Sequence, residues 1–216
     1  MTRAEICRRI EEVGIVPVVR APSAELAIRA ADALIAGGVS VFEITMTVPD
    51  AQAVIRSLVA RFKSSAVIGA GTVLSADDAR SCIDAGAEFI VSPGLDLETI
   101  AAAHERGVPV MPGALTPTEV ITAWKAGSDM VKIFPCSAVG GAKYLKALKA
   151  PLPQVKMMPT GGVSLATVHE FIAAGAAALG IGGELVDIKA LAAGHDDVLT
   201  ERARELVHAV ASARAR

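Results

Sequence analysis

Short apolar runs alternate with amphipathic segments along the whole chain, and this alternation is the feature that most restricts its fold. Each apolar run is rich in β-formers and is followed by a stretch suited to a helix, with a repeat of about 20–25 residues. Runs that are apolar throughout are typical of parallel strands covered on both faces. Eight such runs occur, at Ile15–Arg20, Val39–Thr45, Ala66–Thr72, Phe89–Pro93, Pro109–Gly113, Met130–Phe134, Val155–Thr160 and Ala178–Gly183.

Eight successive strand–helix units predict an α/β fold of the (β/α)8 barrel type. Residues 1–13 predict a short N-terminal helix that caps the barrel, and no linker divides the chain, so residues 1–216 are expected to form one domain. An open doubly wound sheet is the alternative, but its first turn usually carries glycines and VVRAPSAE has none. The other predicted helices are Ala24–Ala36, Asp50–Phe62, Ala76–Asp84, Leu97–Arg106, Pro117–Lys125, Ala142–Lys149, Leu165–Ala173 and Asp196–Ala213.

Single glycines punctuate the alternation between the predicted helices and the next strands. A glycine just after a helix commonly adopts the left-handed C-cap conformation. We therefore expect this conformation at five positions, Gly37, Gly86, Gly107, Gly127 and Gly175.

Composition excludes several classes of function. The 21 basic and 23 acidic residues nearly balance, and no basic stripe with aromatic residues is present, so a nucleic-acid partner is not expected. No apolar run reaches the roughly 18 residues that span a bilayer. Cys7, Cys82 and Cys136 are far apart, which favours reduced thiols. The first residues resemble an amphipathic helix and not a targeting segment, so we expect a cytoplasmic protein.

Few ionisable residues lie near the carboxyl ends of the predicted strands, where barrels carry their chemistry. One of them is Lys132, whose neighbours in MVKIFP are apolar. An apolar setting lowers the pKa of an amine, and the neutral amine can attack a carbonyl carbon to form a Schiff base. The alternative is a structural lysine that reaches solvent or joins a buried ion pair.

Glu43 lies late in the second run, within VSVFEIT. The alternation of a strand places Val41, Glu43 and Thr45 on the inner face, and Phe42 and Ile44 toward the covering helices. A buried carboxylate beside an amine could transfer the protons that Schiff-base chemistry requires. A structural ion pair with Arg20 or Lys132 is the alternative.

Two glycine pairs follow the seventh and eighth runs, Gly161–Gly162 in MMPTGGVS and Gly182–Gly183 in LGIGGEL. Barrels often bind phosphate between these two loops, through backbone N–H groups that glycine leaves accessible. Each pair alone is also a common turn.

The histidines give no support to metal chemistry. His104, His169, His195 and His208 fall outside the strand ends, and no HxH or HExxH motif occurs. We therefore expect neither a metal nor an organic cofactor.

Six stretches together resemble one known family: GGVSVFEITMTVPDA, VIGAGTVLS, AGAEFIVSPG, VPVMPGALTPTE, VKIFPCSAVGG and MPTGGVS. The chain resembles the 2-keto-3-deoxy-6-phosphogluconate (KDPG) aldolases, also called 4-hydroxy-2-oxoglutarate (KHG) aldolases. The resemblance implies a homotrimer of (β/α)8 barrels with class I aldolase activity on a small keto acid. KDPG would give pyruvate and glyceraldehyde 3-phosphate, and KHG would give pyruvate and glyoxylate.

The resemblance also implies the roles of individual residues. Lys132 would form the Schiff base and Glu43 would be the general acid and base. The substrate would contact Arg20, Thr72, Pro93, Phe134, Thr160, Gly161, Gly162, Gly182 and Gly183.

Two positions depart from the pattern of some members. Where some carry an arginine for the substrate carboxylate, this chain has Thr47, and Arg20 fits the arrangement of other members. Some members also have a serine after the last glycine pair, where this chain has Glu184. Because a carboxylate beside a phosphate would repel it, either Glu184 points away or the substrate is less phosphorylated. The alternatives are an aldolase for the phosphogalactonate epimer, a phosphosugar isomerase or epimerase, and an inactive assembly module.

Overall fold

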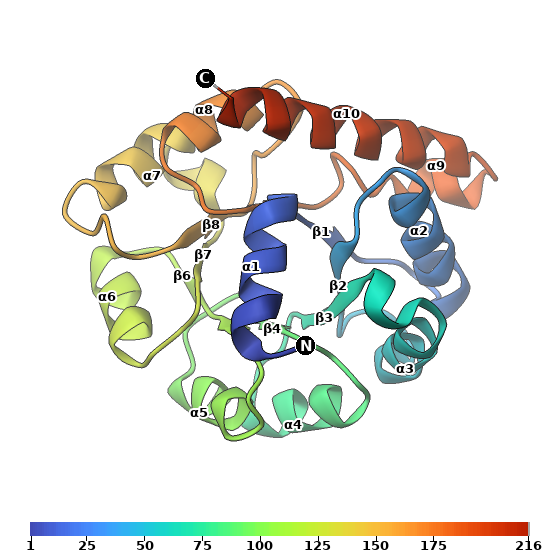
Figure 1. Ribbon diagram of the computed structural model, residues 1–216, viewed down its shortest axis with the longest axis horizontal. Coiled ribbons are helices and arrows are strands. Elements are labelled where there is room, and N and C mark those ends of the chain that lie inside the picture. The colour runs from blue at the N-terminus through green and yellow to red at the C-terminus, as the bar shows by residue number, and fades with distance from the viewer. Residues whose placement is uncertain (216) are drawn as a thin grey trace.

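Parallel strands surrounded by helices form the centre of the computed structural model, which describes residues 1–215 (Figure 1). The strands pair as a curled six-stranded sheet in the order β5-β4-β3-β2-β1-β9 and a three-stranded sheet in the order β6-β7-β8. Their bounds are β1 Ile15–Val19, β2 Val41–Thr45, β3 Val67–Gly71, β4 Ile90–Val91, β5 Val110–Met111, β6 Gly113–Ala114, β7 Val131–Ile133, β8 Met157–Pro159 and β9 Leu179–Ile181.

Each of the eight predicted runs contains a strand, but the pairing is not one unbroken eight-stranded ring. The fifth run is divided into β5 and β6 at Pro112, because proline has no N–H to donate to a ladder. β5 pairs with β4, and β6 pairs with β7. On the other side, β8 and β9 are joined by a single bridge between Thr160 and Gly180.

The helices lie around the strands, and most agree closely with the predicted segments (Figure 1). The predicted Leu165–Ala173 begins three residues later, at Val168, and the short α9 was not predicted. The bounds are α1 Arg3–Val13, α2 Ala24–Ala36, α3 Ala51–Phe62, α4 Ala76–Asp84, α5 Leu97–Glu105, α6 Pro117–Lys125, α7 Ala142–Lys149, α8 Val168–Ala173, α9 Ile188–Ala192 and α10 Asp196–Arg214, with short 3-10 helices at Lys63–Ser65 and Cys136–Val139.

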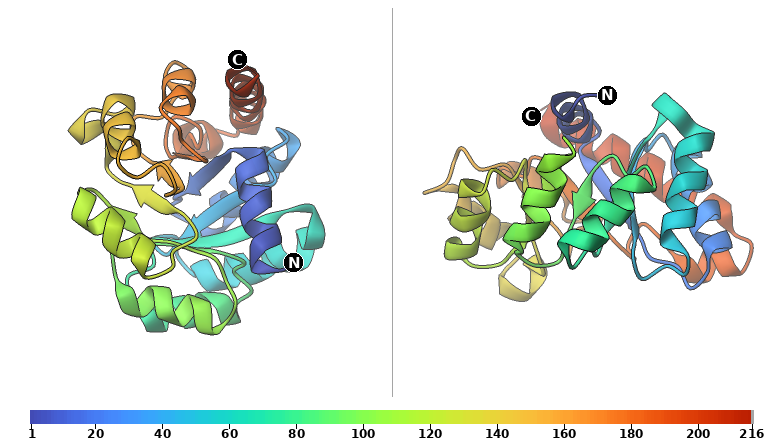
Figure 2. Two further views of the ribbon diagram at one scale, coloured as in Figure 1. Left: turned by 60° about the vertical axis from the view of Figure 1, so that its left-hand side comes forward. Right: turned by 90° about the horizontal axis from the view of Figure 1, so that it is seen from below.

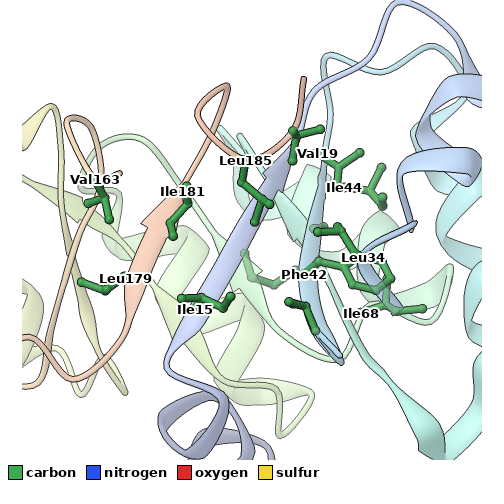
Figure 3. Close-up of a cluster of buried hydrophobic side chains, with 14 of the residues drawn as sticks. Ile15, Val19, Leu34, Phe42, Ile44, Ile68, Val163, Leu179, Ile181 and Leu185 are labelled. Carbon is green, nitrogen blue, oxygen red and sulfur yellow. The ribbon is translucent and has the colours of Figure 1, made fainter. Parts of the chain in front are cut away.

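Buried apolar side chains form two clusters, as the alternation along the strands predicts. The outer cluster packs strands against helices and includes Ile15, Phe42 and Ile44 (Figure 3). The inner cluster fills the space between the strands and includes Val41 and Phe89. Glu43 therefore lies on the inner face of β2, between residues of the inner cluster.

α1 crosses the N-terminal ends of the strands in front of the sheet (Figure 1). α10 packs against α2 and α8 at the edge of the molecule (Figure 2). Ile6 and Ile10 of α1 belong to the inner cluster. The predicted N-terminal helix is thus present and closes the end of the strands opposite to their carboxyl ends.

The expectation for Gly37 is wrong, although those for Gly86, Gly107, Gly127 and Gly175 are confirmed by their positive φ angles. Gly37 has φ −83°, and the left-handed residue is its neighbour Gly38, at φ 87°. Gly37 is required for another reason: a Cβ there would overlap the Cβ of Ala203 on α10. Close packing of two helices, not a turn, uses this glycine.

Among the described residues, no helix combines the length and the apolar character needed to cross a lipid bilayer.

Candidate active site

A cavity of about 220 Å³ lies at the carboxyl ends of the strands. It brings together residues that are far apart in the sequence, because parallel strands all end on the same side of the sheet. All of the predicted substrate-contacting residues line it, and so does Lys132. The lining residues are Val18, Arg20, Thr72, Pro93, Lys132, Phe134, Thr160, Gly161, Gly162, Val163, Gly180, Gly182, Gly183 and Glu184.

Lys132 is the central residue of β7 and extends from the strand into the cavity. Its backbone pairs with Gly113 on one side and Met158 on the other, so its position along the strand is fixed. The side chain is buried, with only 6% exposed. Its Nζ lies 5.2 Å from the centre of the Phe134 ring, at a distance that favours a cation–π interaction.

Glu43 lies on β2, across the inner face from Lys132. Its Oε1 is 3.9 Å from Lys132 Nζ, and its side chain is 1% exposed. Within residues 1–215, neither carboxylate oxygen has a hydrogen-bond partner. Burial raises the pKa of the Glu43 carboxyl above its ordinary value, and the positive charges of Lys132 and Arg20 oppose part of that rise.

A glycine on the neighbouring strand makes room for the Glu43 carboxylate. β2 and β3 pair in register, with Thr45 opposite Gly71. A Cβ at Gly71 would overlap Glu43 Oε1. No sequence motif assigns a role to Gly71, whose only signal is its place near the end of the third apolar run.

The remaining predicted residues surround this pair. Arg20 follows β1 and is exposed, and Thr72 follows β3 with a left-handed backbone at φ 56°. Nothing lies within 4 Å of the Cβ positions of Gly182 and Gly183, so their backbone is open to a ligand. Thr47 is exposed, accepts or donates a 2.7 Å hydrogen bond with Thr45, and is not part of the cavity wall.

Three lining residues were not anticipated: Val18, Val163 and Gly180. The apolar Val18 and Val163 carry no chemistry that a sequence pattern could reveal. Gly180 allows a close approach of β8, because a Cβ there would overlap Thr160 Oγ1. The need for glycine at position 180 comes from this contact between distant segments, which only the folded structure reveals.

No group of three or more His, Cys, Asp or Glu side chains in residues 1–215 is arranged to hold a metal ion. The cysteine thiols are free, and Cys82 and Cys136 are buried. The cavity therefore offers the amine of Lys132, an arginine, the Gly161–Gly162 turn and the open Gly182–Gly183 turn. The carboxylate of Glu43 is not among the lining residues and lies buried beside Lys132, 3.9 Å from its Nζ.

The fold and the cavity define an α/β protein with a lysine–carboxylate site at the strand ends. Comparison with known proteins identifies the family within this class. The family model for KDPG and KHG aldolase matches residues 6–201. The KHG/KDPG aldolase of Escherichia coli (strain K12) is 40% identical over 194 residues, which cover 89% of this chain and 90% of the relative.

Two solved structures are also similar. One, described as a native KDPGal structure, has a TM-score of 0.86 at 32% identity and covers 94% of this chain and 96% of its own. The other is the KDPG aldolase from Legionella pneumophila with pyruvate captured at low pH as a covalent carbinolamine intermediate. It has a TM-score of 0.86 at 31% identity, with coverages of 93% and 97%. The chain therefore belongs to the KDPG and KHG aldolase family.

Proposed function

We propose that this protein is a class I aldolase that cleaves KDPG to pyruvate and glyceraldehyde 3-phosphate. KHG, which would give pyruvate and glyoxylate, is a further substrate. One observation carries the proposal: the buried amine of Lys132 lines the cavity and faces the buried carboxylate of Glu43 at 3.9 Å. A similar protein with pyruvate held as a covalent carbinolamine supports it.

Lys132 is the nucleophile in this mechanism. Its neutral Nζ attacks the C2 carbonyl carbon of the keto acid, and loss of water from the carbinolamine gives an iminium ion. The C3–C4 bond then breaks, and its electron pair moves toward the iminium nitrogen to form an enamine. The C4 hydroxyl loses its proton as the aldehyde is released. Protonation of C3 and hydrolysis of the imine return pyruvate and the free lysine.

Glu43 is the proton carrier for these steps. It takes the C4 hydroxyl proton, directly or through a water, and later returns a proton to C3 of the enamine. A carboxyl with a raised pKa suits this double role, because a raised pKa makes the carboxylate a stronger base toward the C4 hydroxyl and the protonated form can return the proton to C3. No hydrogen bond from residues 1–215 occupies either oxygen, so both keep their capacity to accept a proton.

The substrate ends have separate partners. We assign the carboxylate to Arg20 and Thr72, and the phosphate to the backbone N–H groups of the two glycine turns. Pro93, Phe134 and Thr160 form the wall around the reacting carbons. This chemistry requires no metal or organic cofactor, because the iminium nitrogen accepts the electrons.

We further propose that the two sheets act as one closed (β/α)8 barrel in a single domain. The continuous chain through Pro112 and the Thr160–Gly180 bridge support this arrangement, since they join the sheets on both sides. The homotrimer expected from the resemblance stays a prediction, and mass measurement of the purified protein in solution tests it.

The phosphogalactonate epimer is the second candidate substrate, favoured by the similarity to the structure described as KDPGal. The two substrates differ at one stereocentre. Comparison of kcat/KM for both epimers distinguishes them.

Trapping of the imine tests the proposed function. The protein is incubated with pyruvate and borohydride, and peptide mass spectrometry locates the adduct. We expect a reduced pyruvyl group on Lys132 and none on Lys156. Lys156 serves as an internal control because it immediately precedes β8, at the amino ends of the strands, where it pairs with Glu11 of α1. A folded protein without this adduct, or a Lys132→Ala variant with full turnover, would leave the isomerase or inactive-module alternatives.

A further inference from the structure

Three hollows meet at the Gly182–Gly183 turn, where the glycines leave the backbone open. The first is the active-site cavity. The second, of about 360 Å³, shares Val18, Arg20 and both glycines with it and extends to Lys189. The third, of about 560 Å³, shares Gly183 and Glu184 with the cavity and extends over α10. A substrate that passes this turn therefore has two directions in which its end can point.

The cations around the turn are few. Lys132 is used for the imine and Arg20 for the carboxylate in the proposed function, on which this inference rests. Lys189 is the remaining cation that lines the second hollow. Among the described residues, Lys189 forms no ion pair within 4 Å, so its charge is available to a ligand.

The carboxylate in the second hollow is already engaged. Asp187 accepts hydrogen bonds from the backbone N–H groups of Lys189 and Ala190, both at 3.1 Å, and pairs with Arg202 at 3.1 Å. These interactions hold the pKa of Asp187 below its usual range. Its charge is thus balanced by α9 and by α10, and does not oppose an anion beside Lys189.

The third hollow has the opposite character. Three carboxylates line it, those of Glu184, Asp187 and Glu205, with Arg202 as the single cation. Arg202 and Asp187 balance each other, so the charges of Glu184 and Glu205 are the ones left without a cation among the lining residues. A phosphate carries between one and two negative charges at neutral pH, so it is repelled from this side.

We propose that the phosphate of the substrate turns toward the second hollow and that Lys189 is its cationic partner, which makes Lys189 a specificity-determining residue. Glu184 then belongs to the acidic third hollow and keeps the phosphate from turning that way. This arrangement reconciles a carboxylate beside the last glycine pair with a phosphorylated substrate.

Aldol synthesis from pyruvate tests the proposal with two aldehydes, glyceraldehyde 3-phosphate and unphosphorylated glyceraldehyde. Lys189→Gln should raise the KM for the phosphorylated aldehyde about tenfold, with little change in kcat, because a charge-assisted contact to the bound aldehyde is lost. The KM for glyceraldehyde should change less than about twofold. Lys189→Arg should restore most of the affinity, since it keeps the charge.

Lys125→Gln is the matched control, because Lys125 is also exposed but lies in the last turn of α6, away from these hollows. Equal effects of Lys189→Gln on both aldehydes, or none on either, would overturn the proposal. A lower KM for the phosphorylated aldehyde in Glu184→Gln together with no effect of Lys189→Gln would place the phosphate on the other side. Pyruvate trapping on Lys132 in the same variants separates these outcomes from a failure of the aldolase mechanism itself.

Discussion

The carboxylate of Glu43 occupies the space that a side chain at Gly71 would fill, on the adjacent strand of the same sheet. The obstacle to a larger residue is the far end of a flexible side chain and not the backbone. A methyl group at Gly71 would therefore displace the carboxylate while the strands stay in register.

Gly71→Ala should reduce activity much more than stability. We expect kcat to fall about tenfold to a hundredfold, because a displacement of roughly 1 Å in a proton-transfer group has effects of this size. Pyruvate should still be trapped on Lys132, since the amine is untouched. Steady-state kinetics and a thermal melt of the same sample measure both quantities.

Gly69→Ala is the control on the same face of β3. A Cβ there would overlap the ring of Phe89, which is fully buried in the inner cluster. This variant should lose stability, by about 1–3 kcal/mol, because the ring cannot move aside. If Gly71→Ala also unfolded early and kept its kcat, the role that we give to this glycine would be wrong.

Glu43 should make the folded protein less stable as the pH rises. Its pKa is raised on folding, so the folded state holds the proton more tightly than the unfolded state. The stability that this proton contributes is fully present below pH 4.5, the pKa of the carboxyl in the unfolded chain. It is lost as the pH rises from 4.5 through the higher pKa of the folded state. Glu43→Gln should thus melt at a higher temperature than the unaltered protein at pH 7, with a smaller difference at pH 4.

Glu119→Gln provides a control of opposite sign. Glu119 accepts hydrogen bonds at 2.8 Å from the backbone N–H groups of Leu115 and Thr116, which lower its pKa. Its contribution is present above pH 4.5 and is lost as the pH falls through the lowered folded value. Melting curves recorded from pH 3 to pH 8 should show the two variants diverging in opposite directions, and parallel curves would contradict the prediction.

The adjacent glycines at the end of α2 should respond differently to alanine. At Gly37 a methyl group would overlap Ala203 and lie 2.7 Å from the carbonyl oxygen of Thr200, so α2 and α10 would have to separate. We expect a loss of about 1–3 kcal/mol in the free energy of unfolding. At Gly38 nothing lies within 4 Å, and the cost is about 1–2 kcal/mol of backbone strain at φ 87°.

A suppressor distinguishes these two causes. Ala203→Gly removes the Cβ that a residue at position 37 would meet. It should recover part of the stability of Gly37→Ala and none of that of Gly38→Ala, as urea unfolding can measure. Equal recovery in both would show that packing against α10 is not the reason for Gly37.

The thiols of the folded protein should react slowly. Burial raises the pKa of Cys7 to about 12 and those of Cys82 and Cys136 to about 11, from an ordinary value of 9.0. Only the thiolate reacts, and two pKa units correspond to about 100-fold less of it at pH 8. A colorimetric thiol reagent should modify the native protein slowly and release all three equivalents once it is unfolded. Fast reaction of one native cysteine would contradict this.

Much of the fold was predictable because strands and helices follow local rules. The run VSVFEIT alternates between two faces, and this places Glu43 on the inner face of β2, as the structure confirms. The scarcity of charged residues at strand ends pointed in the same way to Lys132. Both inferences need only the periodicity of a strand and the common direction of parallel strands.

The parts that could not be predicted depend on contacts between distant segments. Gly37 lets α10 pack closely, and Gly71 leaves space for the Glu43 carboxylate. In the sequence, neither can be distinguished from a glycine that is needed for a turn. The division of the fifth run at Pro112 depends on the adjacent strands, because β5 pairs with β4 whereas β6 pairs with β7. Lys189 was not singled out, because its position near Gly183 exists only once α9 has packed against α2 and α10.

The N-terminal helix has a consequence for the order of events in the proposed reaction. Ile6 and Ile10 seal one end of the strands, and the cavity lies at the other. Lys132 is deep within it, whereas Gly183 is at its exposed margin. The aldehyde therefore stands between newly formed pyruvate and the solvent, and it must depart first. In the synthetic direction pyruvate must bind first. Closure of one end of the strands by α1 thus imposes an ordered mechanism on the two reactants.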